Sequence, residues 1–413
     1  MRKMQQYVNN EKIGIVGLGK LGLPMLSAFI SRGFDAYGYD KNPDLITVLR
    51  KGEIPYAEPG LKEITVLDNL WQSRFFNTIE DLVRTVDVVF MIVPTPTVDE
   101  EFETKYLVSA IDSLSRAAAE IIKNIVCVIT STVNPGDTEK IAALAGDLSG
   151  GRVSIVYSPE FIALGSVLED MLHPDLVLLG GSNSDSVDKI FSIYSRLYKT
   201  YPEFHRLSYF EAETAKIAIN TFVTTKISFA NTIGMFVEKS SGSRESGQRV
   251  LNAVGGDSRI GRKYFKYGVS YGGPCFPRDN RALASHLAKS GVCNDLPIAT
   301  DKVNESLVEY WRCKIADQKY DAVVLGGVAY KQGTDFLEES FMLKLARKLK
   351  GLEEISTYYY DDIALEVQDI QKICKLSQDR VLAGYKKVLV LHNHGVVQVD
   401  HSAENIHLIN VWS

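Results

Sequence analysis

The chain has 413 residues and a formal net charge of −5, with 45% hydrophobic and 23% charged residues. Such a composition is typical of a soluble globular protein of about two to four domains, and the acidic balance disfavours nucleic acid or an anionic membrane as partner. The five cysteines are scattered and never in C-x-x-C spacing, which argues against a disulfide framework or a zinc site. Residues 1–10 look like a polar tail and no apolar run reaches membrane-spanning length, so we expect a cytoplasmic α/β protein.

A glycine-rich turn follows the first predicted strand, residues 12–17. The turn is Gly17-Leu18-Gly19-Lys20-Leu21-Gly22, and a helix is predicted from it to about residue 32. A second strand, residues 34–39, ends at Asp40. In this context G-x-G-x-x-G predicts a dinucleotide site, with the pyrophosphate at the helix N-terminus. Asp40 would bind the ribose hydroxyls and repel a 2′-phosphate, which favours NAD over NADP; the alternative is a purely structural turn.

Further apolar strands are predicted at residues 87–93, 125–130, 153–157 and 177–180, alternating with helical patterns. Continuous apolar strands of this kind indicate a parallel sheet that is covered on both faces. Ligands of such sheets bind at the carboxyl ends of the strands. Thr95, Thr132 and Glu160 fall at three of these ends, so they predict a lined crevice, although each residue could instead be a helix cap or a turn residue.

A long helix without proline is predicted from Glu211 to about Lys239, which is about 29 residues or roughly 43 Å at 1.5 Å per residue. Such a helix usually joins domains or packs against a partner subunit. It carries Lys216 and Asn220 four residues apart, on one face. The simple alternative is a solvated lysine beside a capping-type asparagine, but asparagine is a mediocre helix former in mid-helix.

One cysteine lies in a loop rich in glycine and proline, residues 255–280. Cys275 follows the turn Gly272-Gly273-Pro274 and precedes Arg278 and Asp279. Glycines allow the backbone to approach a ligand closely, and a neighbouring cation favours the thiolate, which makes Cys275 a candidate nucleophile. The alternative is that this cysteine is a small buried hydrophobic residue.

The last part of the chain predicts a second α/β segment. Helices are expected at residues 279–289, 300–315 and 339–349, and strands at residues 321–328, 355–360 and 387–391. Three domains are therefore predicted: residues 1–205, 206–316 and 317–413. The histidines at positions 392, 394 and 401 flank an ordinary strand and turn without a carboxylate at ligand spacing, so we expect no metal.

With these motifs named, the chain resembles the nucleotide-sugar 6-dehydrogenase family over nearly its whole length. The matching stretches stand in the family's order: Gly14-Ile-Val-Gly-Leu-Gly-Lys-Leu-Gly-Leu-Pro24; Glu58-Pro-Gly-Leu61; Pro94-Thr-Pro96; Ser131-Thr-Val-Asn-Pro-Gly136; Ser158-Pro-Glu-Phe161; Pro174-Asp175; Ala215-Lys-Ile-Ala-Ile-Asn220 with Lys226-Ile-Ser-Phe-Ala-Asn231; Gly256-Asp-Ser-Arg-Ile-Gly261; Gly272-Gly-Pro-Cys-Phe-Pro-Arg-Asp279; and Ala329-Tyr-Lys-Gln-Gly-Thr-Asp335. The resemblance implies an N-terminal Rossmann domain and a smaller C-terminal Rossmann-like domain, joined by the long helix.

The resemblance also implies a chemistry. The C6 alcohol of a nucleotide-linked hexose would be oxidised to a carboxylate by two hydride transfers to NAD, with the aldehyde held on Cys275 as a thiohemiacetal and then as a thioester. Lys216 matches the family lysine that stabilises the oxyanion, and Asn220 matches its partner. Asp279 matches an aspartate that assists proton transfer, and Glu160 a glutamate that acts as general base through water. Thr132 lies beside this chemistry.

The family pattern assigns two sets of binding residues. The residues expected to hold NAD are Gly17, Gly19, Lys20, Leu21, Gly22, Asp40, Pro94, Thr95, Thr132 and Arg278. The residues expected to hold the nucleotide sugar are Glu160, Phe161, Ile162, Leu164, Lys216, Asn220, Arg259, Tyr264, Tyr271, Gly272, Phe276 and Lys331. The resemblance further implies a homodimer along the long helix, with Arg259 reaching a neighbouring site and residues 317–413 binding UDP.

The chain departs from the family pattern at four positions: Leu164 replaces a glutamate, Leu176 and Glu338 replace arginines, and Arg278 replaces a lysine. UDP-glucose is the first substrate expected, because the loops around Arg259 and Cys275 are closer to that branch than to the GDP-mannose or UDP-N-acetylhexosamine branches. Two other functions are kept: a single-step hydroxyacid dehydrogenase, which needs no loop cysteine, and a non-catalytic nucleotide-sugar sensor, which has no use for a thiolate.

Overall fold

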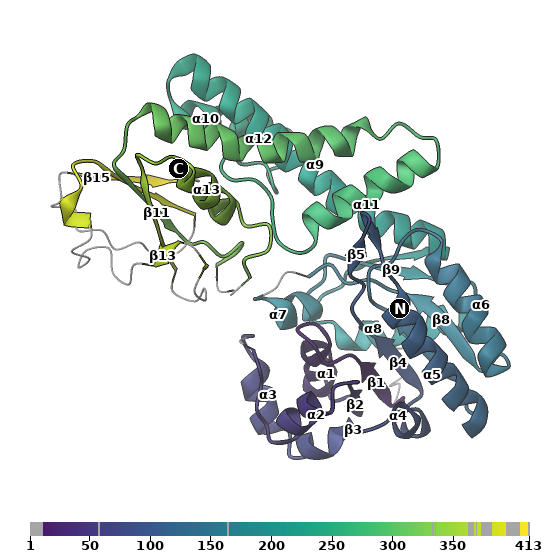
Figure 1. Cartoon of the computed structure of the whole chain (residues 1–413). Coiled ribbons are helices and arrows are strands. Elements are labelled where there is room, and N and C mark those ends of the chain that lie inside the picture. The colour runs from purple at the N-terminus through teal and green to yellow at the C-terminus, as the bar shows by residue number, and fades with distance from the viewer. Residues whose placement is uncertain are drawn as a thin grey trace. The chain divides into compact units, whose positions relative to one another are not determined.

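The computed structural model in Figure 1 describes residues 11–56, 58–162, 165–332, 334, 336–361, 367–368, 370–372, 382–393 and 405–411. The chain divides into two compact units, Met1–Lys216 and Ile217–Ser413. The expected polar tail at residues 1–10 lies outside the described residues. The expected boundary at 316/317 falls inside the second unit, and the three-domain division stays a prediction.

The first unit is built on an eight-stranded sheet in the order β10-β9-β8-β7-β4-β1-β2-β3. Its strands are β1 Ile13–Val16, β2 Ala36–Tyr39, β3 Phe75–Phe76, β4 Val88–Met91, β7 Ile125–Ile129, β8 Val153–Tyr157, β9 Leu176–Gly180 and β10 Glu203–Leu207. The strands from β3 to β8 are parallel, in the order that Rossmann folds use, so the predicted fold class is confirmed for this unit.

The strand at residues 177–180 differs from the expected parallel arrangement. β9 pairs antiparallel with β8 through Tyr157 and Gly180, and β10 then runs parallel to β9. In its described residues, the link between β8 and β9 contains one short helix, α7 (Val167–Leu172), which packs on α1 (Gly22–Ser31). The link does not carry the chain back to the start of β8, so the next strand runs the other way. The last residue of β9, Gly180, lies opposite the last residue of β8, Tyr157.

Helices cover both faces of this sheet (Figure 1). One core contains α1 and α8 (Ser184–Leu197), and the other contains α4 (Ile79–Thr85), α5 (Lys105–Ile121) and α6 (Asp137–Ser149). Successive strand residues alternate between the two cores, as Ile15 and Val16 do, and this explains why the strands are apolar throughout. The links outside the two layers contain α2 Pro43–Arg50, α3 Leu61–Leu67, the 3₁₀ turn Trp71–Arg74, and the hairpin of β5 Thr97–Val98 and β6 Glu101–Phe102.

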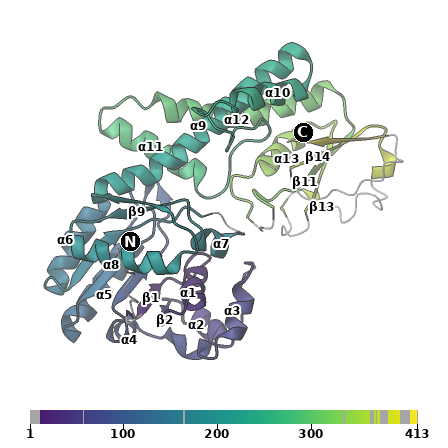
Figure 2. The same ribbon diagram turned by 180° about the vertical axis from the view of Figure 1, so that it is seen from behind.

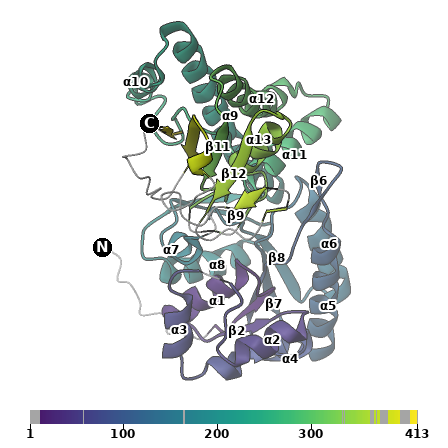
Figure 3. The ribbon, with the colours of Figure 1, turned by 60° about the vertical axis from the view of Figure 1, so that its left-hand side comes forward.

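The second unit contains a five-stranded parallel sheet in the order β13-β12-β11-β14-β15. Its strands are β11 Ala322–Gly326, β12 Ser356–Tyr360, β13 Gln371–Lys372, β14 Val388–His392 and β15 Ile406–Asn410, and a 3₁₀ turn spans Leu382–Gly384. Helix α13 (Phe341–Lys350) packs on β11 and β12 (Figure 3). The strands at 321–328, 355–360 and 387–391 and the helix at 339–349 were expected. The strands β13 and β15, whose residues are exposed or half-buried, were not expected.

The two sheets begin with the same local geometry. Gly17 after β1 and Gly327 after β11 both have positive φ, and each donates its N–H to the last residue of the next strand at 2.9 Å. Asp40 and Asp361 follow those strands, and each accepts a backbone N–H from the glycine turn, at 2.7 and 3.1 Å. The second Rossmann-like unit predicted from the sequence is therefore confirmed.

The rest of the second unit is helical: α9 Tyr209–Ser241, α10 Arg244–Val254, α11 Phe276–Lys289 and α12 Asp295–Asp317 (Figure 2). Helix α9 contains the predicted 211–239 stretch and begins in the first unit. Gly234 within it admits the Tyr267 ring, since a Cβ there would lie 2.1 Å from that ring. In the described part of the chain, no helix is both long and apolar enough to cross a membrane.

Candidate functional site

The three glycines of the first turn differ in what a side chain at each position would meet. Gly17 has φ +92°, and a Cβ on it would lie 2.1 Å from the carbonyl oxygen of Ile92. A Cβ on Gly22 would lie 1.7 Å from the Gly17 carbonyl oxygen, so Gly22 allows α1 to pack on the turn. Gly19 faces open space, with no atom within 4 Å of its Cβ position. This is the cradle that a pyrophosphate needs at the start of α1, where Lys20 and Leu21 complete the turn.

Asp40 is held in place by the backbone. Its Oδ2 accepts the Leu18 N–H at 2.7 Å, and its Oδ1 accepts the Asn42 N–H at 2.8 Å. The first bond ties the carboxylate to the glycine turn itself. A fixed anion at this point can accept hydrogen bonds from ribose hydroxyls and repels a 2′-phosphate, so these residues fit NAD.

The segments that follow β4 and β7 are hydrogen-bonded to each other, as expected for neighbouring parallel strands. Thr95 Oγ1 donates to the Thr132 carbonyl at 2.8 Å. Ser131 Oγ donates to the Val93 carbonyl at 2.7 Å and accepts the Val93 N–H at 3.0 Å. Pro94 lies between these contacts. The predicted residues Thr95 and Thr132 are therefore adjacent, at the same edge of the sheet as the glycine turn.

Lys216 is buried, with 7% of its surface exposed, so it is not the solvated lysine of the simple alternative. Its Nζ donates to the backbone carbonyl of Glu160 at 2.6 Å and lies 4.2 Å from the centre of the Phe161 ring. Burial raises the pKa of the Glu160 carboxyl to about 7, although the Lys216 charge opposes the rise. A carboxyl of this kind can exchange protons near neutral pH.

The Glu160 loop lines a small pocket of the first unit. Residues 158–162 and Tyr198 are among its lining residues, so the predicted Ile162 is part of it. Burial raises the pKa of Tyr198 well above its usual range, and the Glu160 charge adds to this, so the phenol beside the carboxyl stays protonated. The predicted Leu164 lies outside the described residues.

Glu213 is a residue of this region that sequence reasoning missed. It is fully buried, and its two carboxylate oxygens accept the N–H groups of Gly136 at 2.6 Å and Thr138 at 2.7 Å, at the start of α6. Burial raises its pKa, against these hydrogen bonds. Glu213 thereby ties the start of α9 to the loop that follows Thr132. The available signal was an acid three residues before Lys216, on the same helical face.

Asn220 and Asp279 meet in the second unit. Asn220 Nδ2 donates to Asp279 Oδ2 at 2.6 Å, and both side chains are buried. Arg278 Nε lies 3.4 Å from the other carboxylate oxygen of Asp279. This contact explains an asparagine in mid-helix, because its amide holds the first-turn acid of α11 across a sequence separation of 59 residues.

Cys275 is exposed and is the residue that precedes α11, so it is not a buried hydrophobic residue. Its loop is anchored: Gly273, with φ +78°, donates to the Glu338 carbonyl at 3.1 Å, and a Cβ on Gly273 would lie 2.6 Å from the Tyr330 ring. Burial and the Cys275 charge raise the pKa of Tyr330 to about 12. An exposed thiol at a helix N-terminus is in a position that favours the thiolate.

Residues on either side of Cys275 pack tightly. A Cβ on Gly272 would lie 2.3 Å from the Glu339 carbonyl oxygen, so this position requires glycine. Tyr271 is buried and its hydroxyl donates to Asp301 at 3.1 Å. Phe276 makes an edge contact with the exposed Tyr264, at 6.1 Å between ring centres.

Two predicted cations of the second unit have different surroundings. Arg259 is exposed and makes a two-point ion pair with Asp257, at 3.0 and 2.7 Å, within its own loop. Lys331 is half-buried and follows Tyr330, which packs on the cysteine loop. Among the residues that the structure describes, no group of histidine, cysteine and acidic side chains could hold a metal ion, and His394 and His401 lie outside them.

Two family models match the chain. The NAD binding domain of the UDP-glucose/GDP-mannose dehydrogenase family matches residues 11–200, and the central domain of that family matches residues 210–306.

Known proteins resemble the chain over most of its length. A putative UDP-glucose 6-dehydrogenase of Bacillus subtilis is 34% identical over 352 residues, which are 83% of this chain and 79% of that protein. A UDP-glucose 6-dehydrogenase of Pseudomonas aeruginosa is 28% identical, over 82% of this chain and 76% of that protein. The solved UDP-glucose dehydrogenase of Pyrobaculum islandicum superposes with a TM-score of 0.86 at 27% identity, covering 98% of this chain and 94% of that one.

Proposed function

The chain belongs to the UDP-glucose/GDP-mannose dehydrogenase family and is an NAD-binding oxidoreductase, and from this premise we propose that it oxidises UDP-glucose to UDP-glucuronate in two steps. One observation carries the proposal. Cys275 is an exposed thiol at the start of α11, and the acid one turn later, Asp279, is held by the buried Asn220. A single-step hydroxyacid dehydrogenase needs no such thiol, and a sensor gains nothing from it.

The proposed chemistry needs a covalent hold on the aldehyde. NAD, when bound, accepts a hydride in each of the two oxidations. Between them, the Cys275 thiolate adds to the aldehyde carbon and forms a thiohemiacetal, whose oxidation leaves a thioester. Water then adds to the thioester carbonyl, the carbon–sulfur bond breaks, and the thiolate and the C6 carboxylate are released. The thiol thus keeps the reactive aldehyde on the protein.

Each polar residue expected from the family pattern has a task in this proposal. Lys216 is a buried cation that would stabilise the oxyanion, and Asn220 would help to hold a water or the substrate oxygen. Glu160, whose pKa lies at about 7, would take the proton of the alcohol or of the attacking water. Asp279 would assist proton transfer at Cys275. Thr132 and Thr95 would line the cofactor side.

UDP-glucose is proposed because the relatives of 34% and 28% identity are named for it. A solved UDP-N-acetylmannosamine dehydrogenase of Pyrococcus horikoshii has the same fold, with a TM-score of 0.75 at 22% identity, so the fold does not select the hexose. GDP-mannose and UDP-N-acetylhexosamines are therefore the comparison substrates.

The deciding experiment is the amount of NADH formed per molecule of limiting UDP-glucose in excess NAD. A ratio near two supports the double oxidation and UDP-glucuronate as product. A ratio near one contradicts the thioester route. If UDP-glucose gives no NADH, activity with GDP-mannose or a UDP-N-acetylhexosamine replaces the proposed substrate, and inactivity with all of them favours the sensor.

We also propose that the protein is a homodimer through α9. Phe222, Phe229 and Phe236 are seven residues apart, so they lie on one face of the helix, and they are 66%, 52% and 67% exposed. Phe229 is stacked on the buried Phe265 at 5.9 Å, which supports its ring on this face. A stripe of exposed aromatic residues at heptad spacing fits a second copy of the same helix. Arg259, exposed on its loop, would serve the neighbouring site.

A further inference from the structure

We propose that the described residues 52–56 and 58–61, here called the bridging segment, couple the binding of NAD to the binding of the nucleotide sugar within the first unit. The inference rests on the proposed function. It adds two positioning residues, Tyr56 and Glu58, which touch neither reacting group in the proposed chemistry. The Tyr56 side chain forms a hydrogen bond with the glycine turn. The Glu58 side chain forms hydrogen bonds with the far end of the loop that carries Glu160.

The first contact is at the cofactor side. The Tyr56 hydroxyl donates to the Gly19 carbonyl at 3.0 Å. Gly19 is the glycine whose Cβ position faces open space, where a pyrophosphate approaches the turn. Burial raises the pKa of Tyr56, with a smaller contribution from the Glu58 charge, so the hydroxyl remains a donor. Tyr56 therefore fixes the peptide that an NAD pyrophosphate would contact.

The second contact is at the substrate side. Glu58 Oε1 accepts the Val167 N–H at 2.7 Å, and its Oε2 accepts the Gly165 N–H at 3.3 Å. Ser166, the residue that precedes α7, makes no side-chain capping bond, so Glu58 provides the acceptor that a cap would provide. The same carboxylate thus holds the downstream end of the loop that begins with residues 158–162.

The bridging segment is rigid beyond Glu58. Gly60 has φ +84°, and a Cβ on it would lie 2.9 Å from the Leu168 side chain. Leu61 is buried in the same hydrophobic core as Leu168 and the residues of α1. The segment is therefore packed against α7 on one side and hydrogen-bonded to the glycine turn on the other. One residue separates Tyr56 from Glu58 along the chain, so the two hydrogen-bonding side chains belong to the same short segment.

Coupling follows from this connection. A ligand that orders one loop restricts the other through the bridging segment. Binding of the second ligand then has a smaller unfavourable conformational entropy. The effect is reciprocal: NAD strengthens sugar-nucleotide binding by the factor by which the sugar nucleotide strengthens NAD binding. We expect a factor of about ten, within the usual range for coupled sites.

The test measures this factor directly with the full chain. NADH affinity is titrated by its fluorescence with and without saturating UDP-glucuronate, and UDP-glucuronate affinity is titrated with and without NADH. Two variants each remove one contact of the bridging segment. Tyr56→Phe removes the hydroxyl donor, and Glu58→Gln replaces one acceptor oxygen by an NH₂ group that cannot accept a hydrogen bond. Each variant should reduce the coupling factor from about ten to within about twofold of one, while the affinity for each single ligand changes less.

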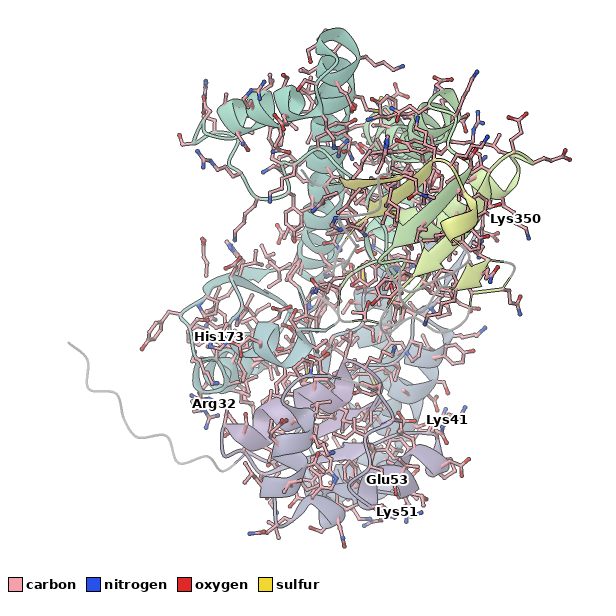
Figure 4. All side chains as sticks on the ribbon, turned by 90° about the vertical axis from the view of Figure 1, so that its left-hand side faces the viewer. Arg32, Lys41, Lys51, Glu53, His173 and Lys350 are labelled. Carbon is pink, nitrogen blue, oxygen red and sulfur yellow. The ribbon has the colours of Figure 1, made fainter. Side chains whose placement is uncertain are left out.

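The control is Glu53→Gln, in the same segment. Glu53 is an exposed side chain of the first unit, labelled in Figure 4, and it should retain the full coupling factor. The double variant should lose no more coupling than either single variant, because both cut the same connection. Thermal unfolding of each variant verifies that it is folded.

Two outcomes overturn the inference, and they are distinct. If the wild-type protein binds both ligands without coupling, or if both variants keep the wild-type factor, the bridging segment does not connect the sites and the proposed function stands. If UDP-glucuronate does not bind even alone, the proposed substrate class fails and the inference fails with it.

Discussion

Two cysteines of this chain show how surroundings decide the reactivity of a thiol. Cys127 is fully buried in β7, and burial raises its pKa to about 12, so it remains an inert thiol at neutral pH. Cys275 is exposed at the start of α11, next to a glycine turn that is anchored to Glu338 and Tyr330. The residue type is the same, and only the second position offers an accessible sulfur in a field that favours the anion.

Replacing Cys275 tests its proposed role. Cys275→Ser should bind UDP-glucose but should not complete turnover, because a serine hydroxyl is a far weaker nucleophile than a thiolate. The measurement is UDP-glucuronate formed at long times, together with UDP-glucose affinity. Cys293→Ser, at another exposed cysteine, is the control and should form the acid at the normal rate. Full acid production by Cys275→Ser would rule out the thioester mechanism.

Glu160 gives a pH dependence with a defined sign. Its folded-state pKa is raised from 4.5 to about 7 because burial disfavours the charged form. As a base it must be ionised, so the rate should rise through pH 7 and fall about tenfold per pH unit well below it. The carboxyl binds its proton more tightly when folded, so its contribution to stability is present below pH 4.5 and is lost as the pH rises to about 7.

The variant Glu160→Gln separates these effects. It should remove the rise of the rate near pH 7, lower the rate by about 10²–10⁴ at pH 8, and lessen the loss of stability between pH 4.5 and 7. Profiles of kcat against pH and denaturation midpoints against pH are the measurements. An unchanged rate profile would remove Glu160 from the proton transfers.

At the scale of elements, α9 organises functional residues through local anchors. Glu213 fixes the helix to the start of α6, and Lys216 follows one turn later. Asn220 holds Asp279 in the first turn of α11, and Ser228 Oγ donates to the Thr300 carbonyl of α12 at 2.9 Å. A long helix can position such residues well, because its backbone needs no support from the loops that it contacts.

The Glu213 anchor makes a prediction at this scale. Glu213→Gln leaves one of the two N–H groups at the start of α6, those of Gly136 and Thr138, without an acceptor, which should cost about 1–3 kcal/mol of stability. The rate should also fall, since the turn that carries Lys216 loses its fixed position. Urea denaturation and NADH formation are measured for this variant and for Glu139→Gln, an exposed acid in the first turn of α6. Equal stability of the two variants would show that Glu213 does not anchor α9.

At the scale of the whole molecule, the chain uses one sheet plan twice. Each unit places a glycine of positive φ after the first strand of its sheet and an acid after the next strand. The first unit has open space at Gly19 for a pyrophosphate, whereas the corresponding turn of the second unit continues into Tyr330, which packs on the cysteine loop. The same plan therefore leaves open space at the glycine turn of one unit and anchors the cysteine loop in the other.

Assembly gives the prediction at this scale. The double variant Phe222→Lys with Phe236→Lys puts two like charges on each copy of the exposed face of α9, so it should be monomeric by native mass spectrometry where the wild type is dimeric. Phe210→Lys is the control, because Phe210 is also exposed on α9 but lies outside the heptad stripe. A monomeric wild-type protein at assay concentration, or a dimeric double variant, would contradict the proposed interface.

The sequence by itself determined the features that depend on neighbours along the chain. The turn at residues 17–22 requires its glycines for steric reasons that the motif already contains, and Asp40 follows at the end of the next strand. The apolar runs became buried strands, parallel in all cases but β9, and the unbroken stretch at 211–239 became α9. Backbone sterics and side-chain periodicity are local, so these elements and the geometry of the glycine turn could be predicted.

Tertiary structure alone decided which distant segments meet. The sequence does not show that β9 runs antiparallel to β8, that Glu213 bonds the start of α6, or that Glu58 holds residues 165–167. The sequence indicated that an asparagine in mid-helix, Asn220, must make a specific contact. It did not indicate that Asp279 is the partner. Such contacts arise from the packing of segments far apart in sequence, and a buried acid finds its hydrogen-bond donors only where the fold brings them.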